Sequence, residues 1–175
     1  MSIQTLEDLY IDQLQDLYSA NRQSLKVTEK LAGKAHNPKL QDALKRGVSG
    51  IEDGINAVEG LIRKHKADPR GEFCQGMEGL VKEAKKHVIE ADIDDDDVRD
   101  VVIVAQYQRM CHYGIAGFGT AKAFAEALGN KDHASKLDTI TSEIYDADEN
   151  MTDLAKRSIN LEAKQSLSRL HPKPK

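Results

Sequence analysis

Hydrophobic residues recur at spacings of three and four along most of the chain, which is the pattern of amphipathic helices. Four long stripes of this kind cover residues 3–31, 40–62, 101–125 and 137–161, and a shorter one covers 77–90. No segment alternates with period two for long enough to be a convincing strand. The pattern predicts an all-α protein of four long helices, with a short extra helix in the crossover between helices 2 and 3.

Turn-forming residues separate these stripes. Pro38 follows Asn37 and should occupy the first position of the second helix, and Gly129 is the expected C-terminal stop of the third long helix. The acidic run at 92–97 fits an N-cap with first-turn acids. A calcium loop is the alternative, but the glycine and terminal glutamate of an EF-hand are missing.

A chain of 175 residues is long enough for one domain that buries its own core. We expect the helical bundle to span residues 1–166. The remaining stretch, 167–175, carries two prolines among basic residues and is expected to be a disordered basic tail.

Composition excludes several classes of partner. The net charge of -4 and the lack of a basic run argue against nucleic acid. The longest apolar run, 101–105, is too short to span a membrane, and the N-terminus lacks the features of a signal peptide. Cys74 and Cys111 have no CxxC spacing and are expected to be free thiols. We therefore expect a cytoplasmic protein.

Several polar residues interrupt the core stripes near the middle of the long helices. Asn21, Cys111 and Asp148 fall on apolar stripes, and Glu52 falls on the edge of one. A helical bundle that binds two metal ions holds its carboxylates at such heights. The alternative for Asn21 is a buried amide that hydrogen-bonds across helices, and for Cys111 it is simple core packing.

Short segments in a fixed order connect the chain to a known family. They are LEDLY at 6–10, DLYSA at 16–20, CQGMEGL at 74–80, ALG at 127–129 and TDLA at 152–155. With them the chain resembles the YciE/YciF group of ferritin-like proteins over about residues 4–160. The resemblance implies a ferritin-like antiparallel four-helix bundle, often dimeric and associated with bacterial stress responses. Many members carry glutamates suited to a di-metal site.

The resemblance also marks where those glutamates would stand, and this chain departs from the pattern at each place. The degenerate positions are Asn21, Ser49, Gly50 and Cys111. Three acids remain as candidate metal ligands: Glu52, Glu143 and Asp148. They could hold one divalent cation, iron or manganese, with His112 nearby, or they could be surface or salt-bridged groups.

No motif for nucleophilic catalysis or phosphate binding is present, and no residue is assigned a catalytic role. We expect a stress-associated structural or interaction protein, homodimeric and without a cofactor, whose di-metal site is degenerate; its protein partner is not identified by the sequence. Two alternatives stay open. One is an iron- or manganese-binding oxidoreductase with a remodelled site. The other is a bundle whose core holds a small ligand, as the small residues Gly114, Gly117 and Gly119 would allow.

Overall fold

The computed structural model describes residues 3–170, with side chains as far as residue 165. Every regular element in this part of the chain is helical, so the predicted all-α class is confirmed. The elements are α1 (Leu6–Lys34), α2 (Pro38–Lys64), α3 (Gln75–Ala84), the π-helical turn η1 (Lys85–Ile89), α4 (Asp96–Ala127), α5 (Lys131–Leu154), the π-helical turn η2 (Ala155–Ile159) and α6 (Asn160–Leu170).

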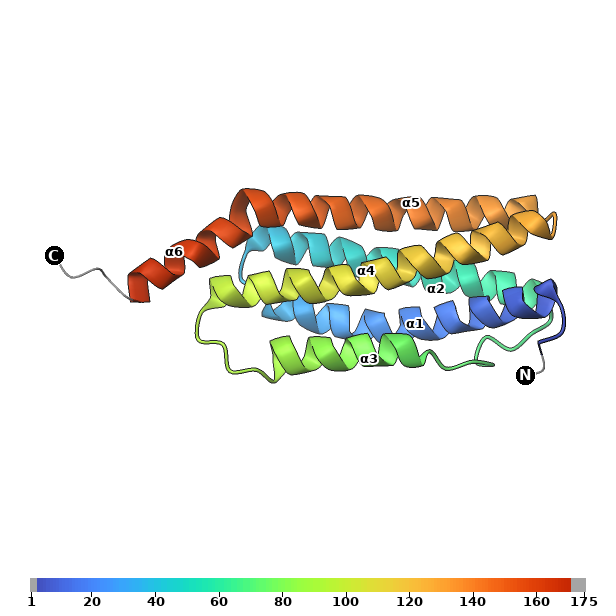
Figure 1. Ribbon diagram of the computed structural model, residues 1–175, viewed down its shortest axis with the longest axis horizontal. Coiled ribbons are helices and arrows are strands. Elements are labelled where there is room, and N and C mark those ends of the chain that lie inside the picture. The colour runs from blue at the N-terminus through green and yellow to red at the C-terminus, as the bar shows by residue number, and fades with distance from the viewer. Residues whose placement is uncertain (1–2, 171–175) are drawn as a thin grey trace.

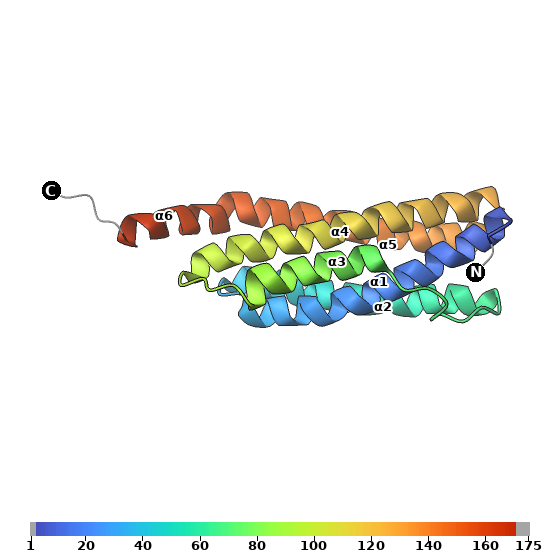
Figure 2. The same cartoon turned by 60° about the horizontal axis from the view of Figure 1, so that its bottom comes forward.

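The four long helices α1, α2, α4 and α5 lie lengthwise beside one another (Figure 1). Helix α2 runs back along α1, and α5 runs back along α4. Helices α2 and α4 point the same way, because the chain returns along the outside of the bundle through α3 before α4 begins. Figure 2 shows α3 lying against the outer side of α1 and α4. None of the helices in residues 3–170 has the length and apolarity of a membrane span.

Local capping explains where the long helices begin and end. Thr5 and Asp8 form a capping box, in which each side chain accepts a hydrogen bond from the backbone N–H of the other, at 3.1 and 3.0 Å. Asn37 caps α2 and Pro38 follows it at the first helical position, as predicted. Gly129 has φ +76° and ends α4, also as predicted.

The acidic run before α4 acts as a helix start. The Asp95 side chain accepts a hydrogen bond from the Val98 N–H at 3.0 Å, and Asp96 and Asp97 lie in the first turn. Carboxylates there complement the positive end of the helix dipole. The N-cap interpretation of this run is therefore confirmed.

Helix α3 is held by a polar contact set around Cys74. The Cys74 N–H donates to Ser19 Oγ at 3.0 Å, and Gln23 Nε2 donates to the Cys74 carbonyl at 3.0 Å. The Cys74 thiol lies 2.8 Å from the Tyr113 hydroxyl, which donates to Asp16 at 3.0 Å. Burial raises the pKa of Cys74, so the thiol stays protonated and serves in packing.

The C-terminal part differs from the prediction of one continuous helix. The turn η2 separates α5 from α6, which bends away and passes the end of the bundle (Figure 1). The buried residues here are spaced by four, which lies between the period of an α-helix and that of a wider π turn. These residues are Met151, Ala155, Ile159 and Ala163.

The domain boundary expected at residue 166 stays a prediction. Helix α6 continues through Leu170, because no helix breaker precedes Pro172. Residues 167–170 lie within this helix. The rest of the predicted tail, 171–175, lies outside the described residues.

The core consists of two apolar clusters at opposite ends of the bundle. One contains Leu31, Leu40 and Ile103 together with residues of α3 and η2. The other contains Tyr10 and Phe118 and surrounds the paired ends of α4 and α5. Polar residues of α1 such as Asn21 and Ser24 are buried between these two ends.

Candidate functional site

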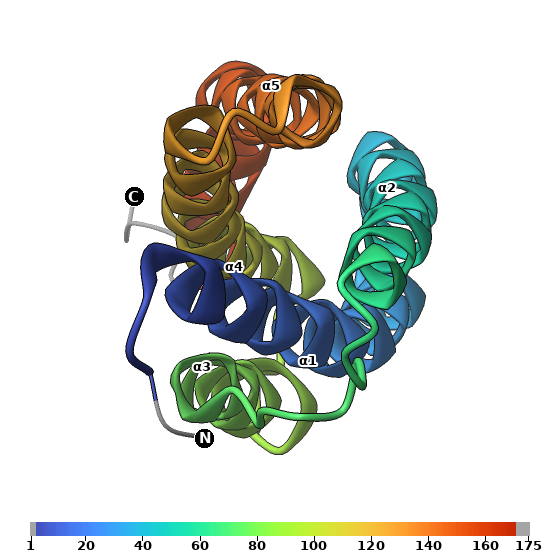
Figure 3. The same cartoon turned by 90° about the vertical axis from the view of Figure 1, so that its right-hand side faces the viewer.

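A cavity of about 470 Å³ lies in the middle of the bundle, and all four long helices contribute to its lining. In the end-on view of Figure 3, α1 lies between α2 and α4, while α2 and α5 stand further apart than the other neighbouring long helices. The exposed lining residues come only from these two helices. They include Arg46, Ser49 and Asp53 on α2, and Glu143, Asp146 and Asn150 on α5. The cavity therefore opens between α2 and α5.

The inner wall of the cavity is mostly apolar with a few polar groups. Helix α1 contributes Asn21 and Thr28, and α4 contributes Tyr107, Cys111 and Phe118, all of them buried. The spacing of these residues on each helix places them on one face, toward the bundle axis. The result is a pocket with a hydrophobic interior and a charged mouth.

The structure brings together most of the positions that the sequence singled out. Asn21, Ser49, Gly50 and Cys111 all line this cavity, and Glu143 lies at its mouth. They come from α1, α2, α4 and α5, and no two neighbouring helices alone would have assembled them.

The other two candidate ligands are elsewhere. Glu52 is exposed on α2 and does not line the cavity. Asp148 is largely covered and already has partners: Gln108 Nε2 donates to it at 3.0 Å, and His112 Nε2 lies 3.1 Å from its other oxygen. Within the described residues 3–170, no group of three or more histidine, cysteine, aspartate and glutamate side chains is placed to hold a metal ion.

The buried Cys111 thiol is unreactive in this environment. Burial raises the pKa of Cys111 to about 12, and the carboxylate of Asp148 adds to this rise against the lowering effect of the Tyr107 hydroxyl. Burial raises the pKa of Tyr107 as well. Both groups are therefore neutral at physiological pH in this setting, and the thiol is a poor nucleophile.

Glycines of α2 shape the cavity wall opposite α1 and α4. A Cβ on Gly47 would collide with the Tyr107 hydroxyl, and one on Gly54 would lie 2.9 Å from Asn21 Nδ2. Only glycine lets these polar tips approach the helix so closely. A Cβ on Gly50 would meet nothing within 4 Å, because Gly50 borders the open part of the cavity.

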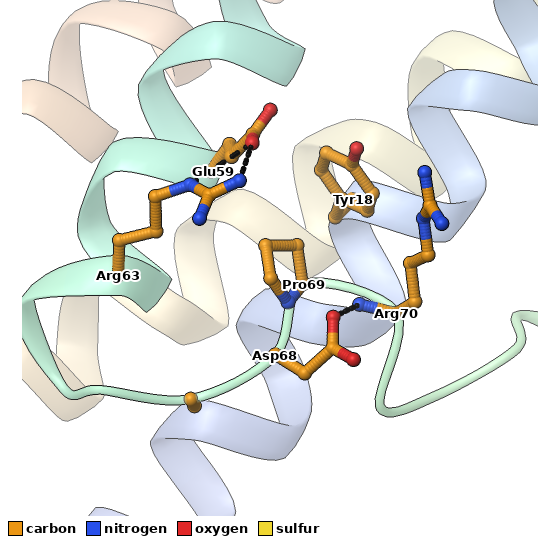
Figure 4. A pocket seen from close by; sticks show the side chains of 7 residues that line it. Tyr18, Glu59, Arg63, Asp68, Pro69 and Arg70 are labelled. Carbon is orange, nitrogen blue, oxygen red and sulfur yellow. Dashed lines mark hydrogen bonds and ion pairs between the residues drawn. The ribbon is translucent and has the colours of Figure 1, made fainter.

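A second depression of about 380 Å³ lies near the end of α2 (Figure 4). Its lining is charged, with one ion pair and one side-chain to backbone hydrogen bond inside it. Arg63 Nε donates to Glu59 at 3.0 Å, and the Asp68 carboxylate accepts the Arg70 N–H at 2.9 Å. This depression is a surface feature of the turn after α2, and the bundle cavity remains the better candidate site.

Two features of the cavity were not foreseen from the sequence. Thr28 lies on the first hydrophobic stripe, and its hydroxyl turns out to be buried without a hydrogen-bond partner. Tyr107 is 4% exposed and lines the cavity, although its sequence context did not single it out. Thr28 is itself a polar residue on an apolar stripe, and that pattern could have identified it as a cavity residue.

The protein is all-helical, with a central cavity lined by polar and apolar side chains. Comparison with known proteins identifies its family. Residues 5–164 match the family described as a domain of unknown function, DUF892. Because this match covers most of the chain, the protein belongs to that family. The sequence is 33% identical to Protein YciF of Escherichia coli (strain K12) over 164 residues, covering 93% of this chain and 98% of that protein.

Two solved structures share the fold. The crystal structure of the E. coli stress protein YciF matches with a TM-score of 0.83 and 33% identity, over 90% of this chain and 99% of that one. YcfI from Rhodopseudomonas palustris, a protein proposed to be structural, matches with a TM-score of 0.80 and 34% identity, over 86% of this chain and 95% of that one. The resemblance to the YciE/YciF group seen in the sequence is thereby confirmed.

Proposed function

We propose that this chain is a stress-associated structural or interaction protein built on a ferritin-like antiparallel four-helix bundle, in which the di-metal carboxylate site is degenerate. It is not a competent ferroxidase. The observation that carries this proposal is that Asn21, Ser49, Gly50 and Cys111 line one cavity. The resemblance puts metal-binding carboxylates at these positions, and this chain has an amide, a hydroxyl, a hydrogen atom and a thiol there.

These side chains do not fit a pair of iron or manganese ions. Such hard cations require several oxygen ligands, and bridging carboxylates hold two of them close together. The Asn21 amide is neutral, and the buried Cys111 would offer a soft sulfur ligand, which suits hard cations poorly. The carboxylates at the cavity mouth, such as Glu143, are exposed and face water.

An interaction role agrees with the relatives and with the surface. The E. coli relative is described as a stress protein, and the R. palustris relative is proposed to be structural. Several large apolar side chains are exposed on this chain, among them Phe73, Tyr145 and Leu161 at 53%, 56% and 52%. Apolar side chains of this kind are what a self-associating surface uses, and the proposal includes a cytoplasmic homodimer.

The competing function is an iron- or manganese-binding oxidoreductase that uses Glu52, Glu143 and Asp148. Of these three carboxylates, Asp148 has side-chain hydrogen-bond contacts, with Gln108 and His112. A histidine that orients a carboxylate is a common feature beside metal sites, which gives this alternative its single supporting observation.

Aerobic oxidation of ferrous iron distinguishes the two functions. We expect the purified protein to oxidise Fe²⁺ no faster than the buffer does, and the variants Glu52→Ala, Glu143→Ala and Asp148→Ala to give the same rate. A rate clearly above the buffer that falls in any of these variants would establish the oxidoreductase instead. Light scattering on the same sample tests the dimer, which should have twice the 19.4 kDa mass of the chain.

A further inference from the structure

We propose that the cavity between α2 and α5 binds a small amphipathic molecule, with an apolar body inside the bundle and one uncharged hydrogen-bonding group at its inner end. The ligand carries no net negative charge. This inference rests on the shape and chemistry of the cavity and does not depend on the proposed structural role.

The size and lining of the cavity suit an organic ligand. Its volume of about 470 Å³ lies within the range of roughly 300–1,000 Å³ that is typical of small-molecule sites. The buried side chains of Phe118, Met110 and Met151 form much of the inner wall. Methionines are flexible and polarisable, so they adapt to ligands of different shape.

The Thr28 hydroxyl indicates what kind of polar group the ligand carries. Thr28 is 0% exposed, lines the cavity, and its Oγ1 has no hydrogen-bond partner. A buried hydroxyl without a partner is destabilising, and native structures rarely keep one unless something satisfies it. A ligand hydroxyl, amine or carbonyl group reaching the inner wall would do so, and the Asn21 amide, also in the lining, could add a second contact.

The mouth of the cavity selects by charge. Arg46 is the one cationic side chain in the lining, while Asp53, Glu143 and Asp146 contribute three carboxylates. One positive and three negative groups give the mouth a net charge of -2, and a ligand enters past them. An anionic head group would be repelled there, whereas an uncharged or cationic one would be accepted.

The open space in front of Gly50 provides a clean way to close the cavity. Because a Cβ at this position meets nothing within 4 Å and Gly50 lines the cavity, Gly50→Leu is expected to place a bulky side chain at the cavity with little strain. Gly60 is a matched control, since it lies on the same helix with equally open surroundings but outside the cavity. Replacing either glycine should strengthen α2, so neither variant is expected to misfold.

The experiment is a fluorescence titration with two aromatic probes, one uncharged and one anionic. 1-Aminoanthracene is uncharged and carries one amine, and 8-anilinonaphthalene-1-sulfonate is an anion. We expect 1-aminoanthracene to bind saturably at one per chain, and the anionic probe to bind at least tenfold more weakly. Gly50→Leu should weaken the binding of 1-aminoanthracene at least tenfold, while Gly60→Leu leaves it within twofold of the original.

Thr28→Val tests the inner contact separately. The change keeps the shape of the side chain and removes its hydroxyl, so it should weaken the binding of 1-aminoanthracene by about three- to tenfold. In the absence of any probe the same variant should have a higher midpoint of urea unfolding, because an unpartnered hydroxyl has been removed from the interior. No saturable binding, equal binding to Gly50→Leu, or a preference for the anionic probe would each overturn the proposal.

Discussion

Removal of the Asp100 carboxylate should weaken the contact between the α1–α2 turn and α4 and destabilise the protein. Asp100 is 1% exposed, and its two oxygens accept the backbone N–H groups of His36 at 2.8 Å and Asn37 at 2.7 Å. Asn37 is also the N-cap of α2, and its amide donates to Glu162 of α6 at 3.1 Å. Asp100 thereby connects α4 to the α1–α2 turn, and Asn37 extends this contact to α6.

The size of the effect follows from these two hydrogen bonds. A hydrogen bond to a charged group contributes about 1.5–3 kcal/mol, and a donor left without a partner costs about 1–3 kcal/mol. Against this, burial raises the pKa of Asp100, which means that the buried charge itself is unfavourable, although the two N–H donors reduce the rise. We therefore expect Asp100→Ala to lower the free energy of unfolding by about 2–3 kcal/mol.

Urea unfolding followed by circular dichroism at 222 nm measures this difference. Asp94→Asn is the control, because Asp94 is exposed in the same acidic run and should change stability by less than about 0.5 kcal/mol. Asp100→Asn should fall between the two, since the amide keeps one accepting oxygen. If Asp100→Ala were no less stable than the control, the role given to this carboxylate would be refuted.

Three further predictions concern other parts of the chain. Gly129→Ala should destabilise by about 1–2 kcal/mol in urea unfolding because of the positive φ, whereas Gly60→Ala should not destabilise. Burial lowers the pKa of His133 below 6.5, so protonation favours the unfolded chain. The free energy of unfolding should therefore fall as the pH drops below about 6.5. In unfolding measured from pH 7 to pH 5, His133→Gln should make that fall smaller. Because Cys111 is buried and its pKa is raised to about 12, its thiol should react with Ellman's reagent at pH 8 only as fast as the protein opens. Immediate reaction of both thiols in the native protein would instead show that the Cys111 thiol is accessible.

Features with a local cause could be predicted from the sequence. Asn37 and Pro38 start a helix, Asp95 caps one and Gly129 ends one, because each effect needs only the residue and its near neighbours in the chain. Helical periodicity likewise gave the four long helices. The two π-helical turns carry no comparable capping or turn residue, and the helical periodicity did not predict them.

The candidate site was predictable in part for the same reason. Asn21 and Cys111 lie on hydrophobic stripes, so their position inside the bundle follows from helical geometry, and both line the cavity. Glu52 lies on the edge of a stripe, where the side chain turns to water, and the structure shows it exposed. The unpartnered hydroxyl of Thr28 depends on every neighbouring group at once, and a sequence pattern does not contain that information.

The metal content of the purified protein tests the central claim most directly. The untagged chain, produced in cells supplied with iron, manganese and zinc, is analysed by plasma mass spectrometry. A degenerate site at Asn21, Ser49, Gly50 and Cys111 predicts far less than one metal ion per chain. One or more ions per chain, lost on Glu143→Ala or Asp148→Ala, would contradict the account and establish a remodelled metal centre.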